Sequence, residues 1–374
     1  MAGIYIHIPF CRKACHYCNF HFSTATKSMD AMMHAIAKEL HLRKLYLQDQ
    51  PIETIYFGGG TPSLVPAELL KELMEQMHTL FHVDTAAEIT LEANPDDITP
   101  ESLAAWQQLG VNRLSVGIQS FDANELLWMN RAHTASQAHD CIPMIQASGF
   151  TNFSIDFIYG SPILTDAQLI DNIAIAIKHK VPHIAAYALT VEPQTALAHF
   201  VEKGKAAGTD AEKQVRQSNI LMQALEDAGY EHYEISNFAM PGFRSQHNSS
   251  YWMSKHYLGV GPGAHSFNGH SRQWNISNNA LYIQSIELGE IPAEIENLTP
   301  AQQLNEYIMT SLRTMEGLSL LKVKEWGEHQ AERIIKTAKP FIMDGRLIQQ
   351  PTALVLSRSG KSWADGIAAA LFED

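Results

Sequence analysis

The segment Cys11-Arg12-Lys13-Ala14-Cys15-His16-Tyr17-Cys18 carries three of the four cysteines of this 374-residue chain, in the spacing C-x3-C-x2-C. It directly follows an apolar stretch, residues 4–10, whose composition is typical of a short buried strand. Thiolate is the soft ligand that iron–sulfur clusters and zinc sites use. Three thiolates can hold three irons of a four-iron cluster and leave the fourth iron open to bind a small molecule.

Two other uses of these cysteines need to be weighed. A structural zinc site normally has four ligands, and His16 or His21 could supply the fourth, so the cysteines alone leave zinc open. A disulfide framework is disfavoured, because three clustered cysteines with only Cys141 elsewhere do not pair. The count and softness of the ligands favour an iron–sulfur cluster over zinc.

The overall composition limits the classes of partner and the compartment. With 27 basic and 40 acidic residues the formal net charge is -13, so we expect no nucleic acid as a main partner. The N-terminus lacks a basic segment followed by an apolar run, which predicts no signal peptide. No apolar stretch is long enough for a membrane-spanning helix. We therefore expect a cytoplasmic protein, in a reducing compartment where thiolates stay available for metal.

The first half of the chain alternates between strand-like and helical patterns. Strands are predicted at residues 4–8, 54–57, 88–92, 113–118, 152–158 and 183–189, and helices at 28–47, 66–81, 100–109, 135–148, 167–179 and 211–228. Such units predict an α/β fold with a parallel sheet, and six of them suggest an open, partial (β/α)6 barrel. A full barrel or a doubly wound sheet would give a similar alternation, so periodicity leaves the closure of the sheet open. The loops after the first four strands carry Cys11, residues 58–62, 94–95 and 119–120, so we expect them to share one rim.

We expect three domains. Residues 1–230 form the partial barrel, 231–297 an α+β extension that packs on it, and 298–374 a small winged-helix-like domain. In the extension, residues 233–238 are predicted to form one strand. In the C-terminal domain, helices are predicted at 301–315, 328–341 and 361–372, with a hairpin from 346–350 and 353–357.

Four motifs together point to a known family. The cysteine segment, Gly58-Gly59-Gly60-Thr61-Pro62, Glu92-Ala93-Asn94-Pro95 and Gly117-Ile118-Gln119-Ser120-Phe121 with Arg131 and His133 resemble the radical S-adenosylmethionine (SAM) superfamily. The resemblance is closest to its oxygen-independent coproporphyrinogen oxidase-like branch and covers nearly the whole chain. It implies a radical SAM barrel in which Cys11, Cys15 and Cys18 hold a [4Fe–4S] cluster. The open iron would bind SAM, and one electron would cleave the sulfonium to methionine and a 5′-deoxyadenosyl radical.

The resemblance also implies the residues that contact SAM. Gly59 and Gly60 lack side chains, so their backbone can approach the methionine part closely. The planar fork of Arg131 suits a carboxylate. Glu92 and Gln119 can hydrogen-bond ribose hydroxyls or the ammonium group. Other positions that match cofactor-contacting positions of the family are Tyr5, Tyr17, Thr61, Asp156 and Ala188.

Departures from the oxidase pattern favour a different function within this branch. The oxidases of this branch show the pattern C-x3-C-x2-C-x-C, and Phe20 occupies the position of its last cysteine. Only ten residues precede Cys11 here, whereas the oxidases carry an N-terminal extension that helps to cover the substrate. Both features resemble the subgroup regarded as haem chaperones, which bind haem and pass it to acceptor proteins. That subgroup shows a signature present here as His247-Asn248-Ser249-Ser250-Tyr251-Trp252. Imidazole can ligate haem iron, so His247 is a candidate haem ligand, and the two aromatic residues can pack on the macrocycle. The alternative is a buried histidine with two aromatic residues that anchor an irregular connection.

The resemblance leaves two rival activities. One is oxidative decarboxylation of coproporphyrinogen III to protoporphyrinogen IX, and the other is radical modification of another tetrapyrrole. We assign no catalytic residue. The expected cofactors are the [4Fe–4S] cluster, SAM and haem. The expected partners are a haem-acceptor protein, such as a respiratory haem protein, and an electron donor. Peripheral membrane association and a homodimer are further expectations.

Overall fold

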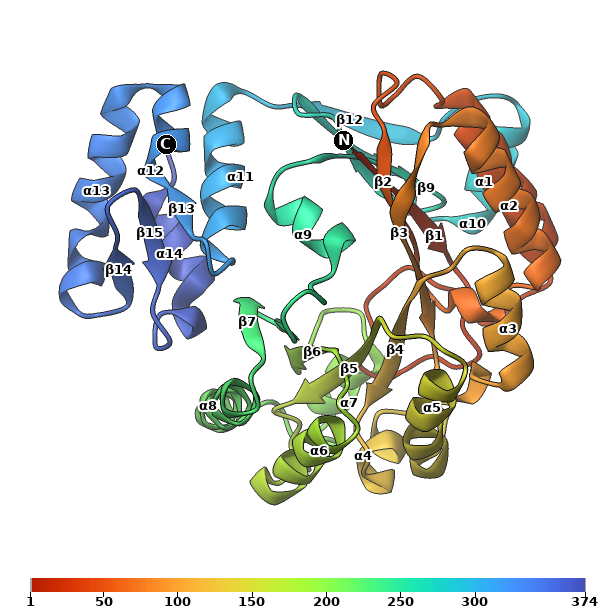
Figure 1. Cartoon of the computed structure of the whole chain (residues 1–374), viewed down its shortest axis with the longest axis horizontal. Coiled ribbons are helices and arrows are strands. Elements are labelled where there is room, and N and C mark those ends of the chain that lie inside the picture. Colours follow the sequence, from red (N-terminus) through yellow and green to blue (C-terminus); the bar gives the residue numbers. More distant parts are fainter. Residues whose placement is uncertain (1, 374) are drawn as a thin grey trace.

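Six parallel strands form the centre of the fold in the computed structural model, which describes residues 2–373 (Figure 1). They lie side by side in chain order and are β1 (Ala2–Ile8), β2 (Ile52–Gly59), β3 (Val83–Ala93), β4 (Arg113–Gln119), β5 (Phe153–Tyr159) and β6 (His183–Ala188). The predicted parallel sheet is therefore confirmed.

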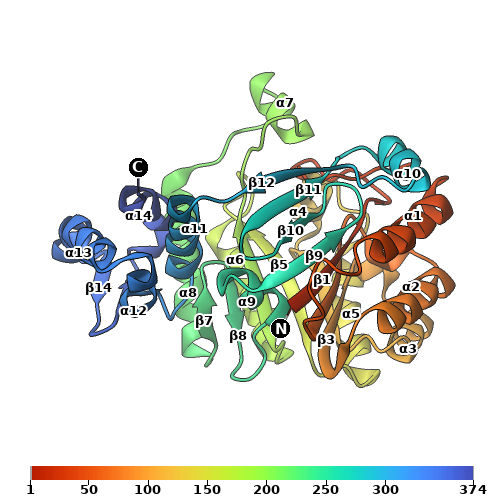
Figure 2. The same ribbon diagram turned by 90° about the horizontal axis from the view of Figure 1, so that it is seen from above.

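Helices follow the strands and cover the outer face of the curved sheet (Figure 1). Those that the sequence predicts are α1 (Met29–Leu42), α2 (Ala67–Leu80), α3 (Pro100–Gln108), α5 (Ala135–Ala147), α6 (Asp166–Lys178) and α8 (Ala211–Asp227). Two short helices within residues 2–230, α4 (Ala123–Trp128) and α7 (Ala196–Glu202), were not predicted. Figure 2 shows α7 projecting beyond the rest of the barrel.

The two faces of each strand differ in polarity, which gives the barrel a polar interior. In β1, Ile4, Ile6 and Ile8 are fully buried in the hydrophobic core that the covering helices complete. Successive side chains of a strand point to opposite faces, so Tyr5 and His7 face the interior. The same alternation places other polar side chains inside: Thr54, Tyr56, Glu88, Glu92, Arg113, Ser115, Ser154, Asp156 and His183.

The segment after α8 differs from the prediction. Residues 233–238 were predicted to be one strand, and this was wrong. They belong to two short antiparallel strands, β7 (Glu231–Glu234) and β8 (Asn237–Ala239). The Glu234 carboxylate makes the turn between them, because it accepts hydrogen bonds from the Ser236 amide and the Asn237 side chain at 3.0 and 2.6 Å.

The rest of this segment extends the opposite edge of the barrel sheet. Strand β9 (His256–Val260) pairs parallel to β1, and β10 (His265–Phe267), β11 (Ser271–Asn275) and β12 (Ala293–Asn297) follow antiparallel. Helix α10 (Asn279–Glu287) packs beside α1. The strands of residues 231–297 are thus hydrogen-bonded into the barrel sheet at both edges. The resulting order, β12-β11-β10-β9-β1-β2-β3-β4-β5-β6-β8-β7, is that of an open sheet.

The signature helix α9 (Gln246–Trp252) lies between the barrel strands and the C-terminal part of the chain (Figure 1). It contacts β2 on one side and α11 (Pro300–Leu312) on the other. Its N-terminus is capped from inside the barrel, because the Glu88 carboxylate accepts hydrogen bonds from the backbone of Gln246 and His247 at 3.1 and 3.0 Å. Helix α9 therefore connects the barrel interior to the C-terminal elements.

The C-terminal elements enclose a core of their own, which includes Leu304, Ile308, Ile334, Leu354 and Ile367. They are α11, α12 (Leu320–Val323), α13 (Glu328–Met343), α14 (Ala364–Leu371) and a small sheet of β13 (Leu318–Ser319), β14 (Leu347–Gln349) and β15 (Ala353–Leu356). The predicted helices and hairpin form, while the three domain boundaries stay predictions. Within residues 2–373, no helix has the length and apolar character needed to cross a bilayer.

Candidate cofactor-binding site

A cavity of about 410 Å³ lies at the carboxyl ends of the parallel strands. The residues that line it come from the cysteine segment and from the exits of successive strands. Among the predicted site residues these are Cys11, Cys15, Tyr17, Cys18, Gly59, Gly60, Thr61, Glu92, Gln119, Arg131, Asp156 and Ala188. Two predicted residues, Tyr5 and His247, do not line this cavity. The expectation that the motif-bearing loops share one rim is thus met by the fold.

The cysteine loop, residues 9–23, is held at its base and at its middle. At the base, the Cys11 amide donates to Ser23 O and the Ser23 amide donates to Pro9 O, at 3.0 and 2.9 Å. At the middle, His16 donates its amide to Met129 O and accepts from the Leu197 amide of α7, at 3.1 and 2.7 Å. These contacts fix the loop between the elements that follow β4 and β6.

The three thiols of the loop are free and half-buried. Burial raises the pKa of Cys11 to about 11 and also raises the pKa of Cys18, so the thiolate forms need a positive partner. Iron is such a partner, and three thiols facing one cavity fit the donor set of a [4Fe–4S] cluster. Within residues 2–373, no three His, Cys, Asp or Glu side chains are grouped as for a single metal ion.

Two side chains donate hydrogen bonds to these sulfurs. Thr61 Oγ1 lies 3.5 Å from Cys11 Sγ, and Arg131 Nη1 lies 3.2 Å from Cys15 Sγ. Arg131 Nη2 donates to Asn94 Oδ1 and Gly117 O, each at 2.7 Å. The Arg131 fork was expected to bind a ligand carboxylate. Both terminal nitrogens instead contact protein atoms, which leaves Nε without a hydrogen bond among the described residues.

The two predicted glycines lie where the surrounding structure leaves no room for a side chain. Gly59 has φ +103°, and a Cβ there would lie 2.6 Å from the His7 ring. A Cβ on Gly60 would lie 2.6 Å from Phe10 O and 2.7 Å from Ile8 O. The end of β2 therefore approaches the entry to the cysteine loop so closely that only glycine fits.

Three carboxyl groups line the cavity, of which Glu92 and Asp156 lie on barrel strands and Glu192 follows β6. Glu92 accepts hydrogen bonds from the Tyr56 hydroxyl at 2.8 Å and from the Gly59 amide at 3.2 Å. Desolvation raises the pKa of Glu92 to about 7, and it raises the pKa of Asp156 to about 7. Near neutral pH each group can thus donate as well as accept a hydrogen bond, which suits recognition of hydroxyl groups.

Gln119 ends β4 in a backbone conformation that is unusual for its residue type. Its φ is +69°, and the pairing of β4 with β5 shifts register between Val116 and Gln119. A residue other than glycine whose backbone is held in the left-handed region, with its side chain at a cavity wall, is typical of a functional position.

His247 and Tyr5 lie in an aromatic cluster inside the barrel. His247 is 2% exposed, with Nδ1 2.8 Å from Thr54 Oγ1 and Nε2 2.8 Å from the Tyr251 hydroxyl. Its ring and that of Tyr5 both stack against Tyr56. Burial lowers the pKa of His247 to about 3 and raises the pKa of Tyr5, so both are neutral. Both imidazole nitrogens already have partners.

Other cavity residues were not singled out by sequence reasoning. Asn94 was quoted only within a motif, although it contacts both sulfur donors, Thr61 and Arg131. Phe20 was noted as a substitution, and its side chain is 66% exposed at the cavity wall. Tyr187, 44% exposed, lines the same cavity, and the strand period of two was the signal that could have placed it.

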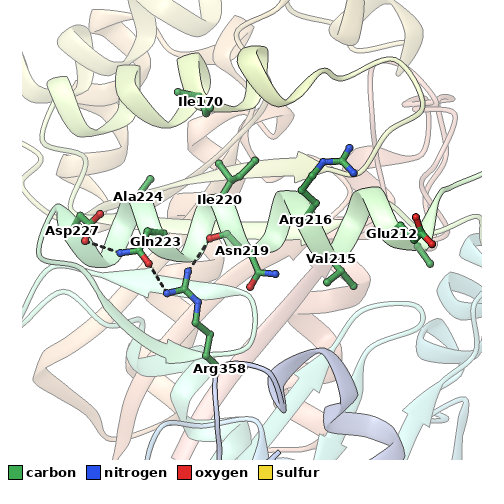
Figure 3. A pocket seen from close by; sticks show the side chains of 11 residues that line it. Ile170, Glu212, Val215, Arg216, Asn219, Ile220, Gln223, Ala224, Asp227 and Arg358 are labelled. Atoms are coloured by element: carbon green, nitrogen blue, oxygen red, sulfur yellow. Dashed lines mark hydrogen bonds between the residues drawn. The ribbon is translucent and has the colours of Figure 1, made fainter.

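A larger and shallower hollow, about 1150 Å³, lies along α8 beside α6 (Figure 3). Ile220 and Val215 are apolar residues of its lining, and Arg358 lies beside α8, where it donates to Asn219 O and Gln223 Oε1 at 2.9 and 2.8 Å. None of the predicted site residues lines it, so the cofactor site is the smaller cavity.

Comparisons with known proteins agree with this geometry. Residues 5–175 match the model of the radical SAM superfamily, whose members use a [4Fe–4S] cluster and SAM. The haem chaperone HemW of Mycobacterium tuberculosis is 33% identical over 99% of this chain and 94% of its own length. HemW of Bacillus subtilis is 32% identical over 96% of each chain.

The solved structure of coproporphyrinogen III oxidase (HemN) from Escherichia coli, described as a radical SAM enzyme, has a similar fold. The TM-score is 0.86 at 20% identity, covering 99% of this chain and 90% of that one. At this identity the likeness concerns the fold, whereas the sequence is similar to the chaperones over nearly its full length. The chain therefore belongs to the radical SAM superfamily, within the HemW family.

Proposed function

We propose that this protein binds haem and transfers it to an acceptor protein. The observation that carries the proposal is the 33% identity to a haem chaperone over 99% of the chain. Phe20 supports it, because an exposed aromatic ring stands where the oxidase pattern has a further cysteine. A phenyl ring cannot ligate iron, but it can pack on a flat apolar macrocycle.

The cavity residues have assigned roles in this proposal. Cys11, Cys15 and Cys18 would hold the [4Fe–4S] cluster, which when bound supplies one-electron reduction of the SAM sulfonium. Glu92 and Asp156 would bind ribose hydroxyls, with Gln119 beside them. The remaining predicted contacts to SAM are Tyr17, Gly59, Gly60, Thr61, Arg131 and Ala188, with Tyr5 acting from behind the wall through Tyr56.

The place of haem follows from the size of the cavity. A volume of about 410 Å³ is near the lower end for pockets that take one small ligand, so SAM leaves no room for a macrocycle beside it. We therefore place haem at the cavity mouth, where Phe20 and Tyr187 expose their rings. Ligation by His247 would require its ring to give up the contact with Thr54 of β2 or the contact with Tyr251 of the same helix.

The remaining partners belong to the same proposal. We propose a respiratory haem protein as acceptor and an electron donor that reduces the cluster. Free thiols on the cysteine loop support a cytoplasmic location, since they need a reducing compartment. Peripheral membrane association would bring the protein to membrane-bound acceptors, and a homodimer is the proposed assembly.

A second candidate activity is oxidation of coproporphyrinogen III or radical modification of another tetrapyrrole. The fold likeness to the oxidase, with a TM-score of 0.86, is the observation that favours it.

Two measurements on anaerobically reconstituted protein separate the candidates. We expect haemin to give a saturable Soret change, and we expect coproporphyrinogen III with SAM and reductant to give no protoporphyrinogen. Phe20→Ala should weaken haemin binding, while Leu127→Ala, which removes a side chain that is 79% exposed and outside the cavity lining, should not. Formation of protoporphyrinogen without a saturable Soret change would favour the oxidase.

A further inference from the structure

One asparagine side chain connects the two groups that donate to the cysteine sulfurs. Asn94 follows β3, and its Oδ1 accepts from Arg131 Nη2 at 2.7 Å while its Nδ2 donates to Thr61 Oγ1 at 3.4 Å. Arg131 Nη1 contacts Cys15 Sγ and Thr61 Oγ1 contacts Cys11 Sγ. A continuous chain of hydrogen bonds thus runs Cys11–Thr61–Asn94–Arg131–Cys15.

The direction of each hydrogen bond in this chain is set by the amide. Arginine only donates, so it must meet the amide oxygen of Asn94. That leaves the amide nitrogen to face Thr61, whose hydroxyl accepts from Asn94 and so points its own hydrogen toward Cys11. A carboxylate at position 94 would accept from Arg131 but would also draw the Thr61 hydrogen away from the sulfur.

The Asn94 side chain has no competing structural task in the loop. Asn94 precedes the short 3-10 helix η2 (Pro95–Asp97), yet its side chain makes no capping hydrogen bond to that helix. Its amide group forms hydrogen bonds with Thr61 and Arg131 instead.

We propose that Asn94 is a positioning residue that holds Thr61 and Arg131 against the sulfurs of Cys11 and Cys15 and thereby raises the reduction potential of the cluster. The inference rests on the proposed cluster ligands. Hydrogen bonds and positive charge at the sulfurs stabilise the reduced cluster more than the oxidised one, because reduction adds negative charge. Asn94 touches neither cluster nor SAM in this account, and it acts through the two donors.

The test is a potentiometric titration of the reconstituted cluster, followed by electron paramagnetic resonance, with iron and sulfide per chain measured on the same samples. Asn94→Leu and Asn94→Asp are expected to keep the iron content and to shift the midpoint potential to more negative values. The shift should be larger for N94D, which adds a charge and redirects Thr61. The matched control is Asn124→Leu, an exposed asparagine of α4 outside the cavity lining, which should leave the potential unchanged.

A second comparison distinguishes positioning from a local effect of the substitution. Thr61→Val and Arg131→Gln should each lower the potential, and N94L should add no further shift once both donors are removed. The inference is overturned if N94D and N94L keep the wild-type potential with intact cluster, or if N94L shifts the potential equally without the donors. Failure of the cluster proposal itself is seen separately, as unchanged iron content in Cys15→Ala.

Discussion

The ring of His247 stacks on the ring of Tyr56, with 4.9 Å between the ring centroids. Because the Tyr56 hydroxyl donates to the Glu92 carboxylate, one tyrosine connects the signature helix α9 with the wall of the cofactor cavity. At the other end of α9, the guanidinium of Arg313 lies 5.3 Å from the Trp252 ring and 2.8 Å from Asp365 of the C-terminal elements. Movement of α9 would therefore change contacts both at the cavity wall and in the C-terminal elements.

The hydroxyl of Thr54 is expected to stabilise α9 in its present place. Thr54→Val keeps the shape of the side chain but leaves His247 Nδ1 buried without a partner, which should cost about 1–3 kcal/mol of unfolding free energy. Chemical denaturation measures the loss. Thr79→Val, which removes an exposed hydroxyl bonded only to Glu75 O within α2, is the control and should cost under about 0.5 kcal/mol. Equal costs for the two variants would contradict the assigned role.

Asp156 should make the apoprotein less stable at alkaline pH. Its folded-state pKa of about 7 lies above the usual value, so the folded chain holds the proton more tightly. The stabilisation is complete below the unfolded pKa, near 4, and is lost as the pH rises through about 7. Asp156→Asn should therefore flatten the decline in unfolding free energy between pH 5 and pH 8, estimated at about 1–3 kcal/mol for this group.

Asp166 supplies the control for this pH series, because its pKa is shifted in the opposite direction to that of Asp156. Asp166 is partly exposed and bonded to Arg216, which lowers its pKa, so its contribution is present at neutral pH and is lost as the pH falls. Asp166→Asn should leave the decline between pH 5 and pH 8 as in the wild type. A D156N variant that keeps the wild-type decline would show that another group controls it.

Gly60→Ala should disrupt the entry to the cysteine loop. The added Cβ would meet two backbone oxygens, of Phe10 and Ile8, which cannot move aside as a flexible side chain would. We expect a loss of about 1–3 kcal/mol or more in stability and a lower iron content after reconstitution. Gly366→Ala, in α14 with open space around it, should be neutral or stabilising by up to about 1 kcal/mol. Wild-type stability and iron content in G60A would refute the close approach.

The three cysteines of the loop should be required for the cluster, and Cys141 should not. Alanine at Cys11, Cys15 or Cys18 is expected to reduce iron and sulfide per chain strongly after anaerobic reconstitution. Cys141→Ala should retain them, since this thiol lies on the buried face of α5, in the hydrophobic core. Retention of a full cluster by any of the first three variants would remove that cysteine from the ligand set.

Much of the barrel could be predicted, because local periodicity determines it. The runs that became β1 and β2 alternate apolar and polar residues, and the longer helices show their apolar spacing within one window of sequence. Helices of six or seven residues, α4 and α7, are too short for that signal. The joining of β9 to β1 is a contact between residues far apart in the chain, so no local pattern indicates it.

For the site, the residues that line the cavity could be predicted, but the contacts between their side chains could not. Motif residues at strand ends reached one cavity because parallel strands end at one rim. The occupied fork of Arg131, the bridging amide of Asn94 and the two partners of His247 depend on side chains brought together across the barrel. Spacing along the chain carries no information on such contacts.

Transfer of haem is the most direct test of the central claim. Protein loaded with haemin is mixed with a tagged apo-haem protein, the two are separated, and the haem in each is measured by its absorption spectrum. We predict that haem appears unaltered in the acceptor, and that its transfer from this protein is faster than its transfer from a complex of haemin with serum albumin. Haem that stays on this protein, or leaves it only as a chemically modified macrocycle, would contradict the chaperone account.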